Sequence, residues 1–403
     1  MSTLAISSPR AARALFVAGL VTVAVLCLGT QSAVAQQTSA EFSDKYNAGV
    51  EAFKARDMGK ALAAAKDAKA AAKSGFEKVA AANLMVNVAG ASGKYADQAD
   101  ALEQLLASDG VPAGSKGQLH KALAGAYAQT GKLDKALGEM KEAMKSGGSA
   151  SDYDMLATLY FGSRDCRNGL EALDKALAGG KEANEQQLKA KDSCYFQMKD
   201  ARLLATAEEL LRRFPKKDWF NQVLSINQDK KIDDMAIFAM LRYGFEHDYL
   251  DNESDFIKLA DRALDVGTTA EAQRVLEKAI SKKIIKKMEK ADGLLKQAKD
   301  RAVEDAKTVA QLDAEAHAGK NGDTDYRVGM RYFSLKQYDK AVDAMQRALS
   351  AERVARVKRP DDANMVLGIS LLKLNKKAEA DKAFNAAKAD ARMAAAAKMW
   401  LGA

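Results

Sequence analysis

A recurring spacing of small residues is the feature that most constrains the fold of this chain. Ala124, Gly329 and Gly368 each precede an alanine by 12 residues, with a short turn between the two. Apolar residues recur on both sides of the turn at the spacing of one helix face. The pattern predicts pairs of helices joined by a tight turn, and its recurrence predicts a repeat architecture.

The composition favours helices along the whole chain. The 403 residues are 48% hydrophobic but only 6% aromatic, and they include 4 prolines. Alanine loses no side-chain entropy in a helix, and scarce proline means few forced interruptions. Lysines and acids are interspersed, with no one-sided basic stripe, so we expect no nucleic-acid partner.

These units resemble the tetratricopeptide repeat, whose period is about 34 residues. The clearest units cover 123–144, 328–349 and 367–387, and the matches extend from Tyr46 to the C-terminal end, with one degenerate unit at 219–247. The resemblance implies an all-α fold, an α–α superhelix of about eight to nine helix pairs. Stacked neighbours then bury the apolar faces that no single unit can bury.

One charged segment interrupts the period. Apolar residues at helical spacing predict a long linker helix over 284–320, broken near Gly293. The chain then divides into an N-terminal array at 36–283, this helix, and a C-terminal pair of units with a capping helix at 321–403. We expect Met393, Met399 and Trp400 to cover the last apolar face.

Residues 1–35 have the features of a signal peptide. Arg10 and Arg13 precede an apolar run over 15–29, and an Ala-Val-Ala cleavage signal ends at Ala35. We expect cleavage after Ala35 and a periplasmic or secreted protein whose formal charge falls from +8 to +6. No later segment is apolar enough to predict a transmembrane helix.

Two cysteines, Cys166 and Cys194, follow this segment. The repeat register places Cys166 at the start of one unit's second helix and Cys194 late in the next unit's first helix. Adjacent antiparallel helices bring a start and an end together, so we predict a disulfide, which an oxidising compartment permits. Two separate buried thiols are the alternative.

The sequence contains no recognisable motif for catalysis or metal binding. His120, His247 and His317 have no second His or Cys at a ligand spacing, and no nucleophile elbow occurs. We therefore expect no cofactor, no metal and no enzymatic activity. Abundant carboxylates leave one enzymatic alternative, a carboxylate-based hydrolase of the envelope with its site in the groove.

The resemblance also implies where a partner binds. In the family, the first helix of each unit lines a concave groove. Carried over position by position, the groove residues are Tyr46, Phe53, Lys54, Asn83, Asn87, Lys121, Gln129, Asp154, Phe161, Tyr326, Phe333, Asn364 and Lys373. Asn83, Asn87 and Lys121 resemble the family's clamp for a peptide carboxylate, which charge-assisted hydrogen bonds would stabilise. Tyr46 and Val50 depart from it, standing where the clamp has lysine and asparagine.

The sequence thus favours a non-enzymatic scaffold or adaptor of the bacterial envelope that holds a protein or peptide in this groove. Besides the hydrolase, a structural protein that self-associates through Met399 and Trp400 remains an alternative. A separate lysine cluster is either a solvated helix face or a contact for anionic lipid. Its members are Lys282, Lys283, Lys286, Lys287 and Lys290.

Overall fold

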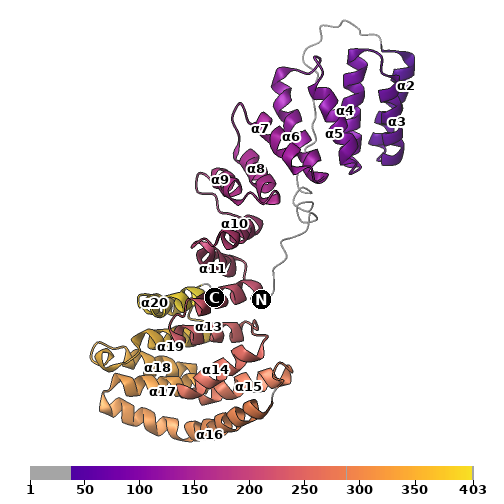
Figure 1. Ribbon diagram of the computed structural model, residues 1–403. Helices are drawn as coiled ribbons and strands as arrows, with labels where there is room; N and C mark the ends of the chain where they lie inside the picture. Colours follow the sequence, from indigo (N-terminus) through magenta and orange to yellow (C-terminus); the bar gives the residue numbers. More distant parts are fainter. Residues whose placement is uncertain (1–37, 287, 402–403) are drawn as a thin grey trace. The chain divides into compact units, whose positions relative to one another are not determined.

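The computed structural model describes residues 38–286 and 288–401, and in these ranges the protein contains helices and turns but no strand (Figure 1). The signal peptide predicted at 1–35, including Cys27, lies outside the described residues. The expectation of an all-α array of helix pairs is confirmed. In eight of the pairs, the first helix packs against the second helix that follows it.

Nine helix pairs, one long helix and a C-terminal helix make up the described chain. The pairs are α2 (Ala40–Lys54) and α3 (Met58–Ala71); α4 (Gly75–Ala91) and α5 (Tyr95–Leu106); α6 (Ala113–Gln129) and α7 (Leu133–Ala143); α8 (Ala150–Gly162) and α9 (Cys166–Ala176); α10 (Glu185–Met198) and α11 (Leu203–Arg213); α12 (Lys217–Asp229) and α13 (Asp234–Glu246); α14 (Glu253–Asp265) and α15 (Thr269–Ser281); α17 (Gly322–Ser334) and α18 (Tyr338–Ala348); and α19 (Pro360–Lys373) and α20 (Lys377–Lys388). The long helix is α16 (Met288–Gly319), a short 3₁₀ turn η1 (Val354–Arg356) precedes α19, and α21 (Ala394–Trp400) is the last helix.

The same left-handed turn joins the two helices of each pair. Gly131, at φ 77°, ends the third pair's first helix, and the amide of Lys132 then donates to the Tyr127 carbonyl at 2.9 Å. Glycine adopts this conformation without steric cost, and asparagine tolerates it. The turn residues are Arg56, Gly93, Gly131, Arg164, Lys199, Lys231, Gly267, Lys336 and Asn375.

Small residues let the helices of a pair approach closely. A Cβ added at Gly368 would lie 2.5 Å from the Phe384 ring, and one added at Gly329 would lie 2.8 Å from the Met345 side chain. Alanines fill the second helices in the same way, since Ala61, Ala65 and Ala68 are fully buried. The spacing found in the sequence is therefore a packing constraint.

The described chain forms two compact units, one ending at Cys194 and the other beginning at Tyr195. In the N-terminal unit, one apolar cluster extends from α2 to α8. The predicted Cys166–Cys194 disulfide is present there, with the two Cα atoms 5.3 Å apart. It joins the first residue of α9 to α10, as the repeat register predicts.

The C-terminal unit contains the predicted long helix. Helix α16 runs through Gly293 without a break, so the interruption expected there is wrong. It packs against α15 and α17 and lies along the bottom of the unit as drawn in Figure 1. Asp305 pairs with Arg331 at 3.0 Å, and Asp313 pairs with Arg347, so charged residues of α16 fasten it to the repeats.

Helix α13 lies inside the C-terminal unit, which the degenerate pattern at 219–247 did not predict. Its residues from Met235 to Gly244 are buried on almost every face, apart from the half-buried Ile237. A helix that is apolar all round belongs in a core. Asp233 before it pairs with Arg359 at 3.0 Å, and Glu246 at its end pairs with Lys373 of α19.

The C-terminal cap is also confirmed, and it packs against α13. Met393, Met399 and Trp400 are 0%, 7% and 3% exposed, and the Trp400 indole N–H donates to the Ala239 carbonyl at 2.9 Å. Self-association through an exposed Met399 and Trp400 is therefore wrong, because both side chains are already covered within the unit.

Candidate functional site

The first helices of the N-terminal unit carry nine of the predicted groove residues. On α2, Tyr46 and Phe53 are half-buried against the apolar cluster of this unit. Tyr46 also stacks on Phe42 with ring centroids 5.5 Å apart. Lys54 is exposed and pairs with Glu51 one turn before it, at 3.6 Å. Helix α2 thus presents two half-buried aromatic rings and, at its C-terminal end, an exposed lysine.

Two asparagines on α4 are the next predicted groove residues. Asn83 and Asn87 lie one helical turn apart and are both half-buried, between the buried Ala82, Leu84 and Val88. Neither amide makes a hydrogen bond to any other part of the chain that the structure describes. Each amide offers two N–H donors and a carbonyl acceptor. The pair can therefore bind groups outside the chain.

Lys121 on α6 differs from the expectation of a clamp. Its ammonium lies 2.7 Å from Asp152 at the start of α8, with side-chain exposures of 27% and 11%. Burial acts to raise the pKa of Asp152, but the hydrogen bonds from Lys121 and Ser149 hold it below its usual value. Asp152 also closes the capping box of α8 with Ser149. The charge of Lys121 is thus already neutralised within the chain by Asp152, which is not the arrangement of a clamp for a ligand carboxylate.

The remaining predicted residues of this unit lie further along the face. Asp154 accepts a hydrogen bond from the Gln187 amide of α10 at 2.6 Å. Phe161 covers Gly169, where an added Cβ would lie 2.5 Å from its ring. Gln129, at the end of α6, is half-buried and, like the two asparagines, hydrogen-bonds to no described residue. Three amides therefore remain available on α4 and α6.

The four predicted residues of the C-terminal unit already contact their own chain. The Tyr326 hydroxyl donates to Asp362 at 2.6 Å, and Lys373 pairs with Glu246 of α13. Phe333 is buried with its ring centroid 5.0 Å from the guanidinium carbon of Arg242, also on α13. Asn364 donates to the Pro360 carbonyl within its own helix, at 2.8 Å. Helix α13 thus occupies the side of α17 and α19 on which a partner was expected.

A buried ionic network surrounds α13, and the repeat pattern in the sequence did not predict its charged pairs. The Arg242 guanidinium donates two hydrogen bonds to Glu271, each 2.8 Å long, and lies 3.9 Å from the Phe238 ring centroid. Burial raises the pKa of Asp362, whose carboxyl accepts from Tyr326. Perturbed groups such as these also occur in catalytic sites. Here they are enclosed by packed helices, which is the arrangement of a structural network.

The described residues include neither a metal-binding cluster nor a helix that could span a membrane. Across 38–286 and 288–401, no group of three or more His, Cys, Asp or Glu side chains is arranged to hold a metal ion. No helix in those ranges is long and apolar enough to cross a bilayer. His120 instead meets Glu139 of α7, with Nδ1 2.6 Å from the carboxylate.

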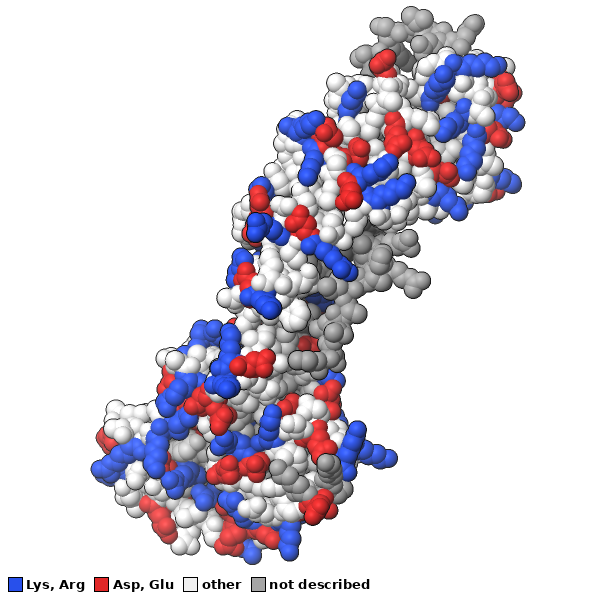
Figure 2. Space-filling view, viewed as in Figure 1, with Lys and Arg blue, Asp and Glu red and all other residues white. Residues whose placement is uncertain are grey.

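Charged side chains of both signs are interspersed on the face shown in Figure 2, in each unit. The predicted lysine cluster is partly neutralised, because Lys282 and Lys278 both pair with Asp248. The backbone amide of Lys286 donates to Glu253 at 3.2 Å. The side chains of Lys287 and Lys290 lie outside the described residues. Among the lysines that are described, the arrangement is that of a solvated surface with local ion pairs.

Comparison with known proteins yields structural neighbours only. No protein-family model and no curated protein sequence matches the chain. A tetratricopeptide repeat protein from Parabacteroides merdae is 12% identical, with 81% of this chain and 98% of that chain covered and a TM-score of 0.29. The tetratricopeptide domain of P58(IPK) is 14% identical, with 90% and 96% covered and a TM-score of 0.24. Naa15/Naa10 bound to HypK-THB gives 16% identity, 86% and 58% coverage and a TM-score of 0.34. The turns and the small-residue contacts described above are those of an all-α array of helix pairs.

Proposed function

We propose that this protein is a non-enzymatic scaffold that holds an extended peptide segment of another protein on the first-helix face of its N-terminal unit. The observation that supports this most directly is the pair of half-buried amides at Asn83 and Asn87, which have no partner in the described chain. Each amide offers N–H donors and a carbonyl acceptor that the rest of the described chain does not use. A peptide backbone offers the complementary N–H and C=O groups at every residue.

The neighbouring charges favour binding over hydrolysis. Asp152 accepts hydrogen bonds from Lys121 and Ser149, and Asp154 accepts one from the Gln187 amide, so both carboxylates are already engaged within the chain. Hydrolysis by a carboxylate pair needs one group with a raised pKa. The pKa of Asp152 is lowered instead.

We also propose that the protein works outside the cytoplasm, in a bacterial envelope or beyond it. The basic, apolar and small-residue order of residues 1–35 supports export. A buried Cys166–Cys194 disulfide agrees with an oxidising compartment. Cell fractionation with mass measurement of the mature N-terminus tests this. A mature chain that begins at Gln36 is expected, and an uncleaved cytoplasmic chain would refute it.

Site-specific photo-crosslinking in cells tests the binding face. A photoreactive residue placed at Asn83, Asn87 or Gln129 should trap one defined partner. The same residue placed at the exposed Asp100 of α5 or Asp174 of α9, both on second helices, serves as control. Equal labelling from both sets of positions, or no partner from the first set, would contradict the proposal.

Affinity measurements with the trapped partner then test whether the two asparagine side chains contribute to binding. Replacing both Asn83 and Asn87 with alanine removes two hydrogen-bonding side chains, each contributing about 1 kcal/mol. Binding should weaken roughly 10- to 30-fold. Asn385→Ala on α20, whose amide is exposed and bonded within its own helix, should leave the affinity unchanged.

A further inference from the structure

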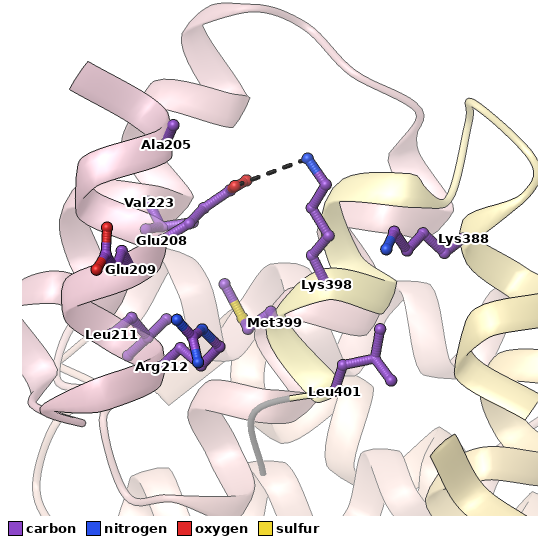
Figure 3. Close-up of a pocket in the computed structure, with 10 residues that line it drawn as sticks. All are labelled: Ala205, Glu208, Glu209, Leu211, Arg212, Val223, Lys388, Lys398, Met399 and Leu401. Carbon is purple, nitrogen blue, oxygen red and sulfur yellow. Dashed lines mark ion pairs between the residues drawn. The ribbon is translucent and has the colours of Figure 1, made fainter. Parts of the chain in front are cut away.

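A depression on the C-terminal unit has no counterpart in the repeat pattern. It lies between α11, α12 and the C-terminal ends of α20 and α21, and its volume is about 350 Å³ (Figure 3). That size falls at the lower end of the roughly 300–1,000 Å³ typical of small-molecule sites. The depression belongs to a different unit from the asparagine face and is independent of the function proposed for it.

The floor of the depression is apolar. Leu211 of α11, Val223 of α12 and Met399 of α21 are all buried, and Leu401 closes one side. Ala205 of α11, which is exposed, leaves the entrance open because its side chain is small. A hydrocarbon chain or ring that rests on this floor would be stabilised by the removal of apolar surface from water.

The rim is charged, and its cations are incompletely paired. Glu208 faces Lys398 across the depression at 3.7 Å, which is longer than a direct hydrogen bond (Figure 3). Glu209 is already bonded to Arg213, at 2.9 Å. Arg212 and Lys388 also line the rim, and neither has an ion pair or hydrogen bond with any residue of the described ranges.

We propose that this depression binds a small amphipathic carboxylate, with an aliphatic tail on the apolar floor and its single negative charge among Arg212, Lys388 and Lys398. Of the two rim carboxylates, Glu209 is already paired with Arg213, so only Glu208 offsets these three cations. A carboxylate with an aliphatic tail suits both parts of the depression, because the tail covers the apolar floor and the charged end lies among these cations. Hydrogen bonds from guanidinium and ammonium groups to a carboxylate are charge-assisted and therefore stronger than hydrogen bonds between neutral groups.

Isothermal titration of the full mature chain with octanoate tests the site, with octanol and octylammonium as probes of equal chain length. Octanoate should bind at least tenfold more tightly than either. Equal affinity for octanol would show an apolar patch without charge recognition, and no measurable heat with millimolar octanoate would show no site. Both outcomes overturn the proposal.

Removing a rim cation and removing a rim carboxylate should change the affinity for octanoate in opposite directions. Arg212→Gln and Lys388→Gln should each weaken octanoate binding about three- to tenfold, since each removes an attracting charge. Glu208→Gln should strengthen it by a similar factor, because it removes the competing carboxylate. Lys382→Gln, also on α20 but away from the depression, is the matched control and should change nothing.

Blocking the entrance gives a test that does not depend on charge. Ala205→Phe places a ring over the floor from an exposed helix position, so the fold should be preserved, as circular dichroism can verify. Octanoate binding should then be lost. Unchanged binding in folded Ala205→Phe would place the ligand elsewhere and overturn the assignment.

Discussion

Arg242 shows at the scale of a single residue what the repeat pattern cannot predict. It is a charged side chain at a buried position of α13, and its partner Glu271 lies on α15. The helical period only marks the position as inward-facing. Whether an inward-facing charge finds a partner depends on which side chain stands opposite it, here Glu271. The spacing of small and apolar residues does not specify that side chain, which is why this network was missed.

Removing Arg242 should destabilise the C-terminal unit strongly. Arg242→Met leaves the Glu271 carboxylate buried without a partner, which typically costs about 3–5 kcal/mol. The double variant Arg242→Met/Glu271→Met should recover most of that loss, since two apolar groups replace the pair. Urea unfolding followed by circular dichroism measures both. A single variant within 1 kcal/mol of the wild type would show that the pair is not needed.

Glu77 connects the beginnings of α2 and α4. Its carboxylate accepts hydrogen bonds from the backbone amides of Ser74, Ser39 and Lys73, and these bonds lower its pKa to about 2. A carboxyl with a lowered folded-state pKa stabilises the protein above its unfolded pKa, about 4.5. That contribution is lost as the pH falls from about 4.5 towards 2.

The stability difference between the wild type and Glu77→Gln should therefore depend on pH. At pH 7 the variant should unfold at a lower temperature, because the ionised acceptor is gone. The gap in melting temperature should narrow steadily below about pH 4.5. Asp67→Asn, an exposed acid on α3, controls for the change in net charge. A gap as wide at pH 3 as at pH 7 would contradict this role.

At the scale of elements, the sequence was most informative. Helix pairs, their turns and the Cys166–Cys194 disulfide follow from spacing, because each depends on neighbours within about one repeat. The break predicted at Gly293 failed for a different reason. Glycine costs only about 1 kcal/mol in a helix interior, and the contacts of α16 with α15 and α17 outweigh that cost.

Two glycines of the repeats should respond to alanine in opposite directions. In Gly368→Ala, the new methyl group meets the buried Phe384 ring at 2.5 Å, and such overpacking typically costs about 1–3 kcal/mol. Gly138, inside α7, has no side chain within 4 Å of an added Cβ. Gly138→Ala should stabilise by about 0.5–1 kcal/mol through helix propensity. Denaturant unfolding that gave both variants the same sign would refute the packing role of Gly368.

At the scale of the whole molecule, the resemblance to the repeat family predicts partner-binding positions that other parts of the chain already occupy. It locates first helices correctly, but it assumes that each of them faces solvent or a partner. In the C-terminal unit α13 fills that side, and Trp400, 161 residues from Ala239, bonds to it. Contacts over that distance depend on how many units stack and how they curve. The spacing inside one unit contains no such information.

Trp400 should therefore be a major stabilising residue despite its place near the end of the chain. It stacks on Phe384, meets the Tyr243 ring edge-on at 5.3 Å, and donates to Ala239. Trp400→Ala should lower the free energy of unfolding by about 3–5 kcal/mol. Trp400→Phe should cost less, because it keeps most of the ring contact. A cost below 1 kcal/mol for alanine would show that the closure of α21 over α13 contributes little.

The placement of Trp400 also has a consequence for the intrinsic fluorescence of the protein. The chain has two tryptophans, and both Trp219 and Trp400 belong to the unit that begins at Tyr195. Intrinsic tryptophan emission therefore reports on that unit alone, while the asparagine face is spectroscopically silent at the same wavelengths. A single Tyr46→Trp substitution would give the N-terminal unit its own signal, so that each half could be followed separately in one sample.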